Sequence, residues 1–145
     1  MATLLLALVT IAVSNQAAVD DATLRKAQAE AARICAVADI PIVWGESTFR
    51  VIVRREPRGG PGASSPSALG TTLGDDHSHG GASFVFYDRV LRLAHKYQQP
   101  AAAVLALAIA HEIGHLLLPA PAHTATGLMK PEWDGDDIRR LLMRR

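Results

Sequence analysis

The stretch from Ala101 to Met129 constrains this chain more than any other, because it joins an apolar helix to a group of potential metal ligands. Within it, His111, Glu112 and His115 form the pattern H-E-x-x-H. At 3.6 residues per turn, a step of four residues leaves the two imidazoles about 40° apart on one helix face, so both can reach one ion. Glu112 lies beside that face, where it can accept a proton from a metal-activated water without being a ligand.

The residues before this pattern strengthen the interpretation. Residues 104–109 are apolar on every side, which is typical of a helix buried in the centre of a domain. Two histidines and a glutamate are costly in such a place unless they have a partner, and a metal ion supplies one. The alternative is a helix whose polar residues are simply hydrogen-bonded at the surface.

A catalytic zinc usually takes three protein ligands and keeps a fourth position for water. The nearest candidate for the third ligand is His123, eight residues after His115. Pro119 and Pro121 lie between them, and both stop a helix and let the chain turn back. The sequence therefore predicts a site made from one helix and the loop that follows it.

Four features together resemble the metzincin branch of the zinc metallopeptidases. They are HEIGH at 111–115, the downstream His123, Gly-Leu-Met at 127–129 as a Met-turn, and Asp-Asp-Ile at 136–138 opening a last helix. The usual metzincin motif places its third histidine six residues after the second, so the loop of this chain is two residues longer.

The resemblance implies both a fold and a set of roles. The fold would be α+β and zincin-like (metzincin-type), a single domain with a small mixed sheet packed on the central HExxH helix and with a C-terminal helix. The cofactor would be zinc, with His111, His115 and His123 as ligands. Glu112 would be the general base, and Met129 would pack beneath the metal.

Glu132 competes with His123 for the third position. With Asp136 it forms E-x-x-x-D, which resembles the third-ligand helix of the gluzincins. We favour His123, because neutral imidazole is a common zinc ligand and Glu132 follows Pro131 in an expected loop. Residues of a second loop, Asp75, Asp76, His77 and His79, could hold another metal, but a solvated loop is favoured because no further ligands follow at fixed spacing.

The first residues of the chain permit two interpretations. Residues 1–19 carry no charged side chain, and Leu4 to Val13 is an apolar run of signal-peptide length. Residues 9–14 also alternate as in a half-buried strand. We expect a strand at 8–14, with residues 1–7 as a remnant of an export signal, 8–145 as the catalytic domain, and a secreted or periplasmic protein. The run is too short and polar for a membrane span.

The remaining elements are predicted from periodicity. Asp20 and Asp21 are expected to begin a helix that reaches Ala38 and buries Cys35 as a structural thiol. Residues 40–44 and 49–56 are expected to be strands, and 83–87 an edge strand above the cleft that binds extended peptide, as in metzincins. Asp136 or Asp137 is expected to cap a helix at 138–143.

Composition narrows the function further. The chain has 145 residues, of which 49% are hydrophobic, and this fits one globular domain. A formal net charge of +1 gives no field that favours nucleic acid as a partner. We therefore predict a zinc metallopeptidase, an endopeptidase rather than an exopeptidase, acting on peptides or proteins. The alternatives are a non-catalytic zinc-binding domain and a degenerate peptidase that serves as a binding module.

Overall fold

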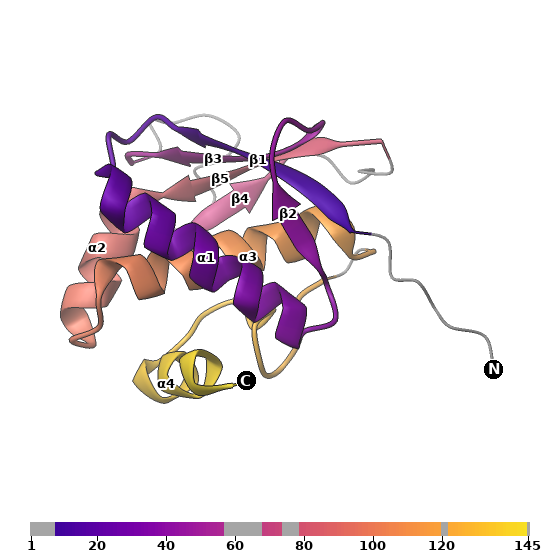
Figure 1. Ribbon diagram of the computed structural model, residues 1–145. Helices are drawn as coiled ribbons and strands as arrows, with labels where there is room; N and C mark the ends of the chain where they lie inside the picture. The colour runs from indigo at the N-terminus through magenta and orange to yellow at the C-terminus, as the bar shows by residue number, and fades with distance from the viewer. Residues whose placement is uncertain (1–7, 57–67, 74–78, 120–121, 145) are drawn as a thin grey trace.

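A computed structural model of the chain describes residues 8–56, 68–73, 79–119 and 122–144. These residues form a small α+β domain with one mixed sheet and helices packed on it (Figure 1). The elements in chain order are β1 (Val9–Asn15), α1 (Asp21–Val37), β2 (Ile42–Trp44), β3 (Phe49–Arg54), β4 (Gly70–Thr72), β5 (Gly81–Phe86), α2 (Tyr87–Lys96), α3 (Ala101–Leu117) and α4 (Gly135–Met143).

The strands lie in the order β2-β1-β3-β5-β4. Four of them are parallel, and β4 alone runs antiparallel to its neighbour β5. One row of side chains crosses the sheet from Val13 through Val51 and Ser83 to Thr72, because these residues are register partners on successive strands. Val51 and Ser83 are fully buried, so this row belongs to the face that the helices cover.

The first strand and the first helix are confirmed within one residue of their predicted bounds. Asp20 is the N-cap of α1, and its carboxylate accepts a hydrogen bond of 3.0 Å from the backbone N–H of Thr23. The buried face of α1 includes Ala27, Ala31 and Cys35. Burial raises the pKa of the Cys35 thiol to about 12, so this cysteine is a packing residue, as predicted.

Helix α3 passes beneath the sheet and lies beside α1 (Figure 1). Every residue from Val104 to Ala110 is buried, which confirms the prediction of a central apolar helix. Pro100 is the N-cap, and the helix ends at Leu117, before Pro119. Despite its composition α3 is not a membrane span, and no helix in the described part of the chain has the length and hydropathy for one.

Two predictions about the sheet need correction. Residues 83–87 do not form an edge strand, because β5 lies between β3 and β4, and Tyr87 already belongs to α2. The edge is β4, a strand of three residues, Gly-Thr-Thr, that is too short to show a period in the sequence. Ser83 and Val85 are both fully buried, as expected of an inner strand.

The cap of the last helix also differs from its prediction. Helix α4 begins at Gly135, and its N-cap is Asp134 rather than Asp136 or Asp137. Asp134 and Asp137 form a reciprocal capping box, with backbone-to-carboxylate hydrogen bonds of 2.8 and 2.9 Å. The interpretation of residues 1–7, and that of Asp75, Asp76 and His77 as metal ligands, lies outside the described residues.

Candidate functional site

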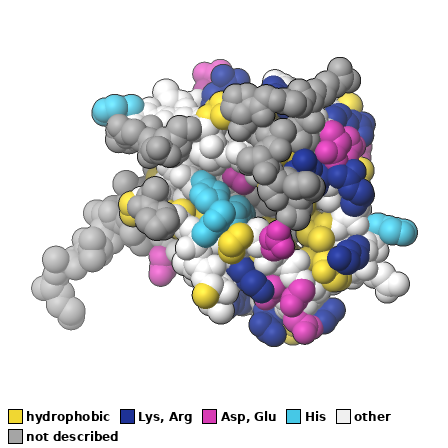
Figure 2. Space-filling model, turned by 180° about the vertical axis from the view of Figure 1, so that it is seen from behind, with side chains coloured by type: hydrophobic (Ala, Val, Ile, Leu, Met, Phe, Trp, Pro, Cys, Tyr) yellow, Lys and Arg dark blue, Asp and Glu magenta, His cyan; other side chains and the backbone are white. Residues whose placement is uncertain are grey.

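The second half of α3 carries the polar residues of the site. His111 and His115 are half-buried, whereas Glu112 between them is only 3% exposed. The helix continues for two residues beyond His115, and the chain then returns to the same face with His123. In Figure 2, histidine side chains gather at the surface near the middle of the face shown.

The three imidazoles converge on one point. Nε2 of His115 lies 3.1 Å from Nε2 of His111 and 3.0 Å from Nε2 of His123. The three candidate ligand atoms lie within 4.8 Å of one another, and they form the one such group of His, Cys, Asp or Glu among the described residues. Glu132 is exposed and is not a member of it. We call these three residues the histidine cluster.

The protonation of His111 is fixed by its surroundings. Its Nδ1 lies 2.7 Å from the carbonyl oxygen of Leu128, and because a carbonyl can only accept, Nδ1 carries the hydrogen. In neutral His111 the lone pair is therefore on Nε2, the atom that faces His115. Burial lowers the pKa of His111 below its usual value, which favours this neutral form.

This donor set fits a zinc ion. Nitrogen lone pairs that face each other at about 3 Å repel unless a proton or a cation lies between them. In a tetrahedral site with Zn–N distances of about 2.0–2.1 Å, ligand nitrogens lie about 3.3 Å apart, close to the two separations found here. A backbone carbonyl that orients a ligand histidine through its other nitrogen is also typical of metal sites.

A tight turn at residues 127–130 supports the cluster from below. Gly127 has φ of +82°, a conformation that favours glycine, and its carbonyl accepts from the N–H of Lys130 at 3.2 Å. The N–H of Thr124 donates to the carbonyl of Met129 at 3.0 Å, which joins the turn to the segment that carries His123. The turn thus holds the third histidine near the helix.

Met129 packs directly on α3. A β-carbon added to Gly114 would lie 2.4 Å from Sδ of Met129, so the sulfur occupies the space that this glycine leaves open. Gly114 lies between His111 and His115 in the chain, so the buried Met129 packs on the part of α3 that carries both histidines. The ring of Trp133 packs edge-on against the ring of His111, with 5.5 Å between the ring centroids.

Glu112 points to the sheet side of α3. Its Oε2 accepts hydrogen bonds from the hydroxyls of Ser83 at 2.7 Å and Thr72 at 3.0 Å. Burial raises the pKa of Glu112 to about 7, and the two hydroxyl hydrogen bonds oppose that rise. A carboxyl group with a pKa near neutrality is suited to both accept and release a proton.

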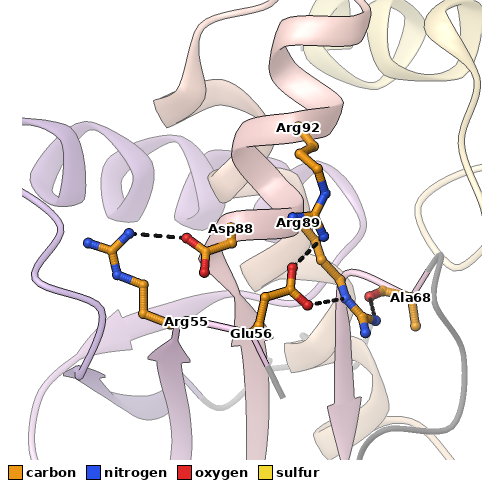
Figure 3. A network of polar contacts seen from close by, with 6 residues as sticks. All are labelled: Arg55, Glu56, Ala68, Asp88, Arg89 and Arg92. Carbon is orange, nitrogen blue, oxygen red and sulfur yellow. Dashed lines mark hydrogen bonds and ion pairs between the residues drawn. The ribbon is translucent and has the colours of Figure 1, made fainter. Parts of the chain in front are cut away.

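A network of polar contacts fixes the edge strand that contributes Thr72 (Figure 3). Arg89 on α2 donates to the carbonyl of Ala68 at 2.6 Å, two residues before β4 begins, and also contacts Glu56 at 3.3 Å. Glu56, which follows β3, pairs with both Arg89 and Arg92 and so helps to fix the arginine that contacts Ala68. The strand beside Glu112 is therefore anchored to the body of the domain.

The sequence identified the histidines and Glu112 but missed the groups that orient them. Ser83, Thr72 and the carbonyl of Leu128 were not expected to take part. One feature of the sequence could have indicated Ser83. It is a hydroxyl residue two positions before Val85, on the same buried face of the strand. The contact from Thr72 depends on the pairing of β4 with β5, which no local pattern reveals.

No protein-family model matches this chain, and none of the curated proteins is similar enough in sequence to count as a relative. What the chain can do chemically therefore has to follow from the side chains described above. These side chains are three imidazoles that face one point, two from α3 and one from the loop after it, and the buried carboxylate of Glu112 on α3.

Proposed function

We propose that this protein is a zinc-dependent metallopeptidase with a metzincin-type zincin fold. The observation that carries the proposal is the convergence of the three imidazole nitrogens beside a buried glutamate of H-E-x-x-H. The opening strand and long helix, the turn under the histidines and the closing helix all agree with the resemblance found in the sequence. Together these features support the proposal.

The histidine cluster would hold the metal. A bound zinc would supply a Lewis acid that polarises a peptide carbonyl and makes water more acidic. The Leu128 carbonyl orients His111 by its contact with Nδ1, which leaves the lone pair of Nε2 available to a metal ion. His123 completes the set from the loop.

Glu112 would act as the general base and then as the general acid. Its carboxylate would take a proton from the attacking water and pass it to the nitrogen of the departing amine. A pKa raised to about 7 by burial matches both steps at neutral pH. Its position one residue after His111 keeps it beside the metal ligands without making it one of them.

Substrate would bind along the edge strand β4. In the described part of the chain β4 pairs with β5 on one side, and no strand pairs with its other side. An extended peptide can add to such an edge through main-chain hydrogen bonds. Backbone pairing of this kind holds the chain on both sides of a cleavage point, which favours an endopeptidase.

The direct test is metal content measured together with cleavage. Purified protein should contain about one zinc per chain by mass spectrometry of the elements. It should cut a mixed peptide library at internal bonds, lose this activity on chelation and regain it with zinc. Zinc binding with no cleavage of any peptide would instead support a non-catalytic metal-binding domain, and absence of both would reject the proposal.

A further inference from the structure

We propose that Ser83 and Thr72 form a hydroxyl pair that positions Glu112 by one oxygen and leaves the other free for proton transfer. This inference rests on the proposed function, because it assigns both residues a role in the reaction of Glu112. They would be positioning residues, since their hydroxyl groups act through the carboxylate of Glu112.

The contacts of the carboxylate are unequal. Both hydroxyls lie at hydrogen-bond distance from Oε2, Ser83 at 2.7 Å and Thr72 at 3.0 Å. No hydrogen bond within the described part of the chain involves Oε1. Oε1 lies against the edge strand instead, where a β-carbon added to Gly70 would be 2.8 Å from it. One oxygen is thus held and the other is left for a proton.

Ser83 brings a hydroxyl group into the buried face of the sheet. Ser83 is fully buried, and its register partner on β3 is Val51. A buried hydroxyl costs about 1–3 kcal/mol without a partner, so an aliphatic residue would fit this row better. Places where one residue breaks the local pattern are expected to be functional sites. The hydroxyl of Ser83 finds its partners in Glu112, Thr72 and the carbonyl of Thr71.

The hydroxyl protons suffice for this arrangement. Ser83 has one proton and two acceptors in reach, Oε2 of Glu112 at 2.7 Å and the carbonyl of Thr71 at 3.1 Å. Thr72 has one proton and can donate to Oε2 or to the oxygen of Ser83, which is 2.6 Å away. The 2.6 Å contact between the two hydroxyl oxygens takes one proton, and the carboxylate takes the other, because hydrogen bonds to a charged acceptor are the stronger ones. The carboxylate is then fixed in one orientation.

The variants are chosen to separate the hydroxyl from packing. Thr72→Val removes the hydroxyl and keeps the shape, whereas Thr72→Ser keeps the hydroxyl and removes a methyl group. Ser83→Ala removes the second hydroxyl. Thr10→Val is the control, because Thr10 is a half-buried threonine on β1, a strand that contributes no residue to the proposed site.

The expected result is a loss in kcat of about tenfold for Thr72→Val and for Ser83→Ala, with KM and zinc affinity close to those of the parent. Thr72→Ser should restore most of the lost kcat, and Thr10→Val should leave the parental kcat unchanged. Parental kcat in the Thr72→Val/Ser83→Ala double variant would overturn the inference. So would an equal loss in Thr72→Ser and Thr72→Val, or an effect on KM alone.

A second measurement does not depend on activity. Crystals of the metal-free double variant should show the Glu112 carboxylate turned away from its parental orientation, and an unchanged orientation would refute the role of the hydroxyls. If the parent cleaves no peptide, the proposed function fails, while this measurement still decides whether the pair orients Glu112. If Ser83→Ala does not fold, Thr72→Val on the half-buried edge strand provides the same test.

Discussion

The two sides of helix α3 support their polar groups in different ways. On the sheet side, Glu112 is buried, and its hydrogen bonds come from Thr72 and Ser83 on two paired strands. On the loop side, the histidine cluster includes the exposed His123, whose ring contacts His115. From this comparison we propose that the sheet fixes the carboxylate as the domain folds, and that a bound cation would hold the histidine of the loop in place.

The largest effects should come from removing a group on each side in turn. His111→Ala should lose both zinc and cleavage, because it removes one of the three proposed ligands. Glu112→Gln should keep zinc and lose roughly a thousandfold in kcat, because it removes the general base and keeps the shape. Zinc content and steady-state kinetics measure both. Parental turnover in Glu112→Gln would show that the proton acceptor is another group.

Metal removal should affect the two sides unequally. After chelation, the amides of Thr124 and Lys130 should exchange their hydrogens faster, because their hydrogen bonds belong to the loop that carries His123. Amides of β5 should keep their protection, since the sheet and α3 hold them without the ion. Hydrogen exchange followed by mass spectrometry checks this. Equal loosening of β5 and the loop would mean that the two sides are not independent.

Gly70→Ala should disturb the sheet side. The added carbon would lie 2.3 Å from the carbonyl oxygen of Phe84, a backbone atom that cannot move without shifting a strand. We expect a loss of about 1–3 kcal/mol in the free energy of unfolding and a lower kcat, with zinc affinity retained. Chemical denaturation and kinetics measure these quantities. A large fall in zinc affinity would contradict the separation of the two sides.

Gly114→Ala is the matched change on the loop side and should be milder. Its added carbon would meet Sδ of Met129 at 2.4 Å, and a methionine side chain can move aside more easily than backbone. Zinc affinity should fall, because the turn beneath the histidines is displaced, and kcat per bound zinc should change little. Adding Met129→Ala to this variant should recover part of the affinity. No recovery would point to strain within α3 itself.

The smallest effect is expected at Cys35. This thiol is fully buried on α1, and its pKa of about 12 leaves almost no thiolate at pH 8. A thiol reagent should therefore fail to modify the folded protein both with and without zinc, and should react once the chain is unfolded. Reaction on chelation alone would show that metal loss opens the core as well as the loop.

Local patterns predicted the parts of the fold that a short stretch of chain determines. The apolar run before His111 gave α3, and the carboxylate of Asp20 gave the start of α1. The spacing of His111 and His115 also gave the two helical members of the cluster, because side chains four residues apart share a face. These elements depend on neighbours within one or two turns.

The parts that the sequence did not predict depend on pairing between distant residues. Gly70 to Thr72 form an edge strand only because β5 lies beside them, so three residues with little hydrophobic pattern could not be recognised. The role of Ser83 follows from its register with Thr72 and from the approach of α3. The sequence predicts a cap at Asp136 or Asp137, whereas Asp134 is the cap and Asp137 is its partner in the capping box, because three nearby aspartates all suit the start of a helix.

Two adjacent residues of the turn at 127–130 make separate contacts with α3. Leu128 offers its carbonyl to His111, and Met129 fills the space above Gly114. An insertion between them would misalign at least one, so this part of the chain has a fixed length. In the described residues between His115 and His123, which are 116–119 and 122, no two neighbours contribute such a pair of contacts to the site. Engineered changes in spacing should therefore be tolerated before His123 and rejected after Gly127.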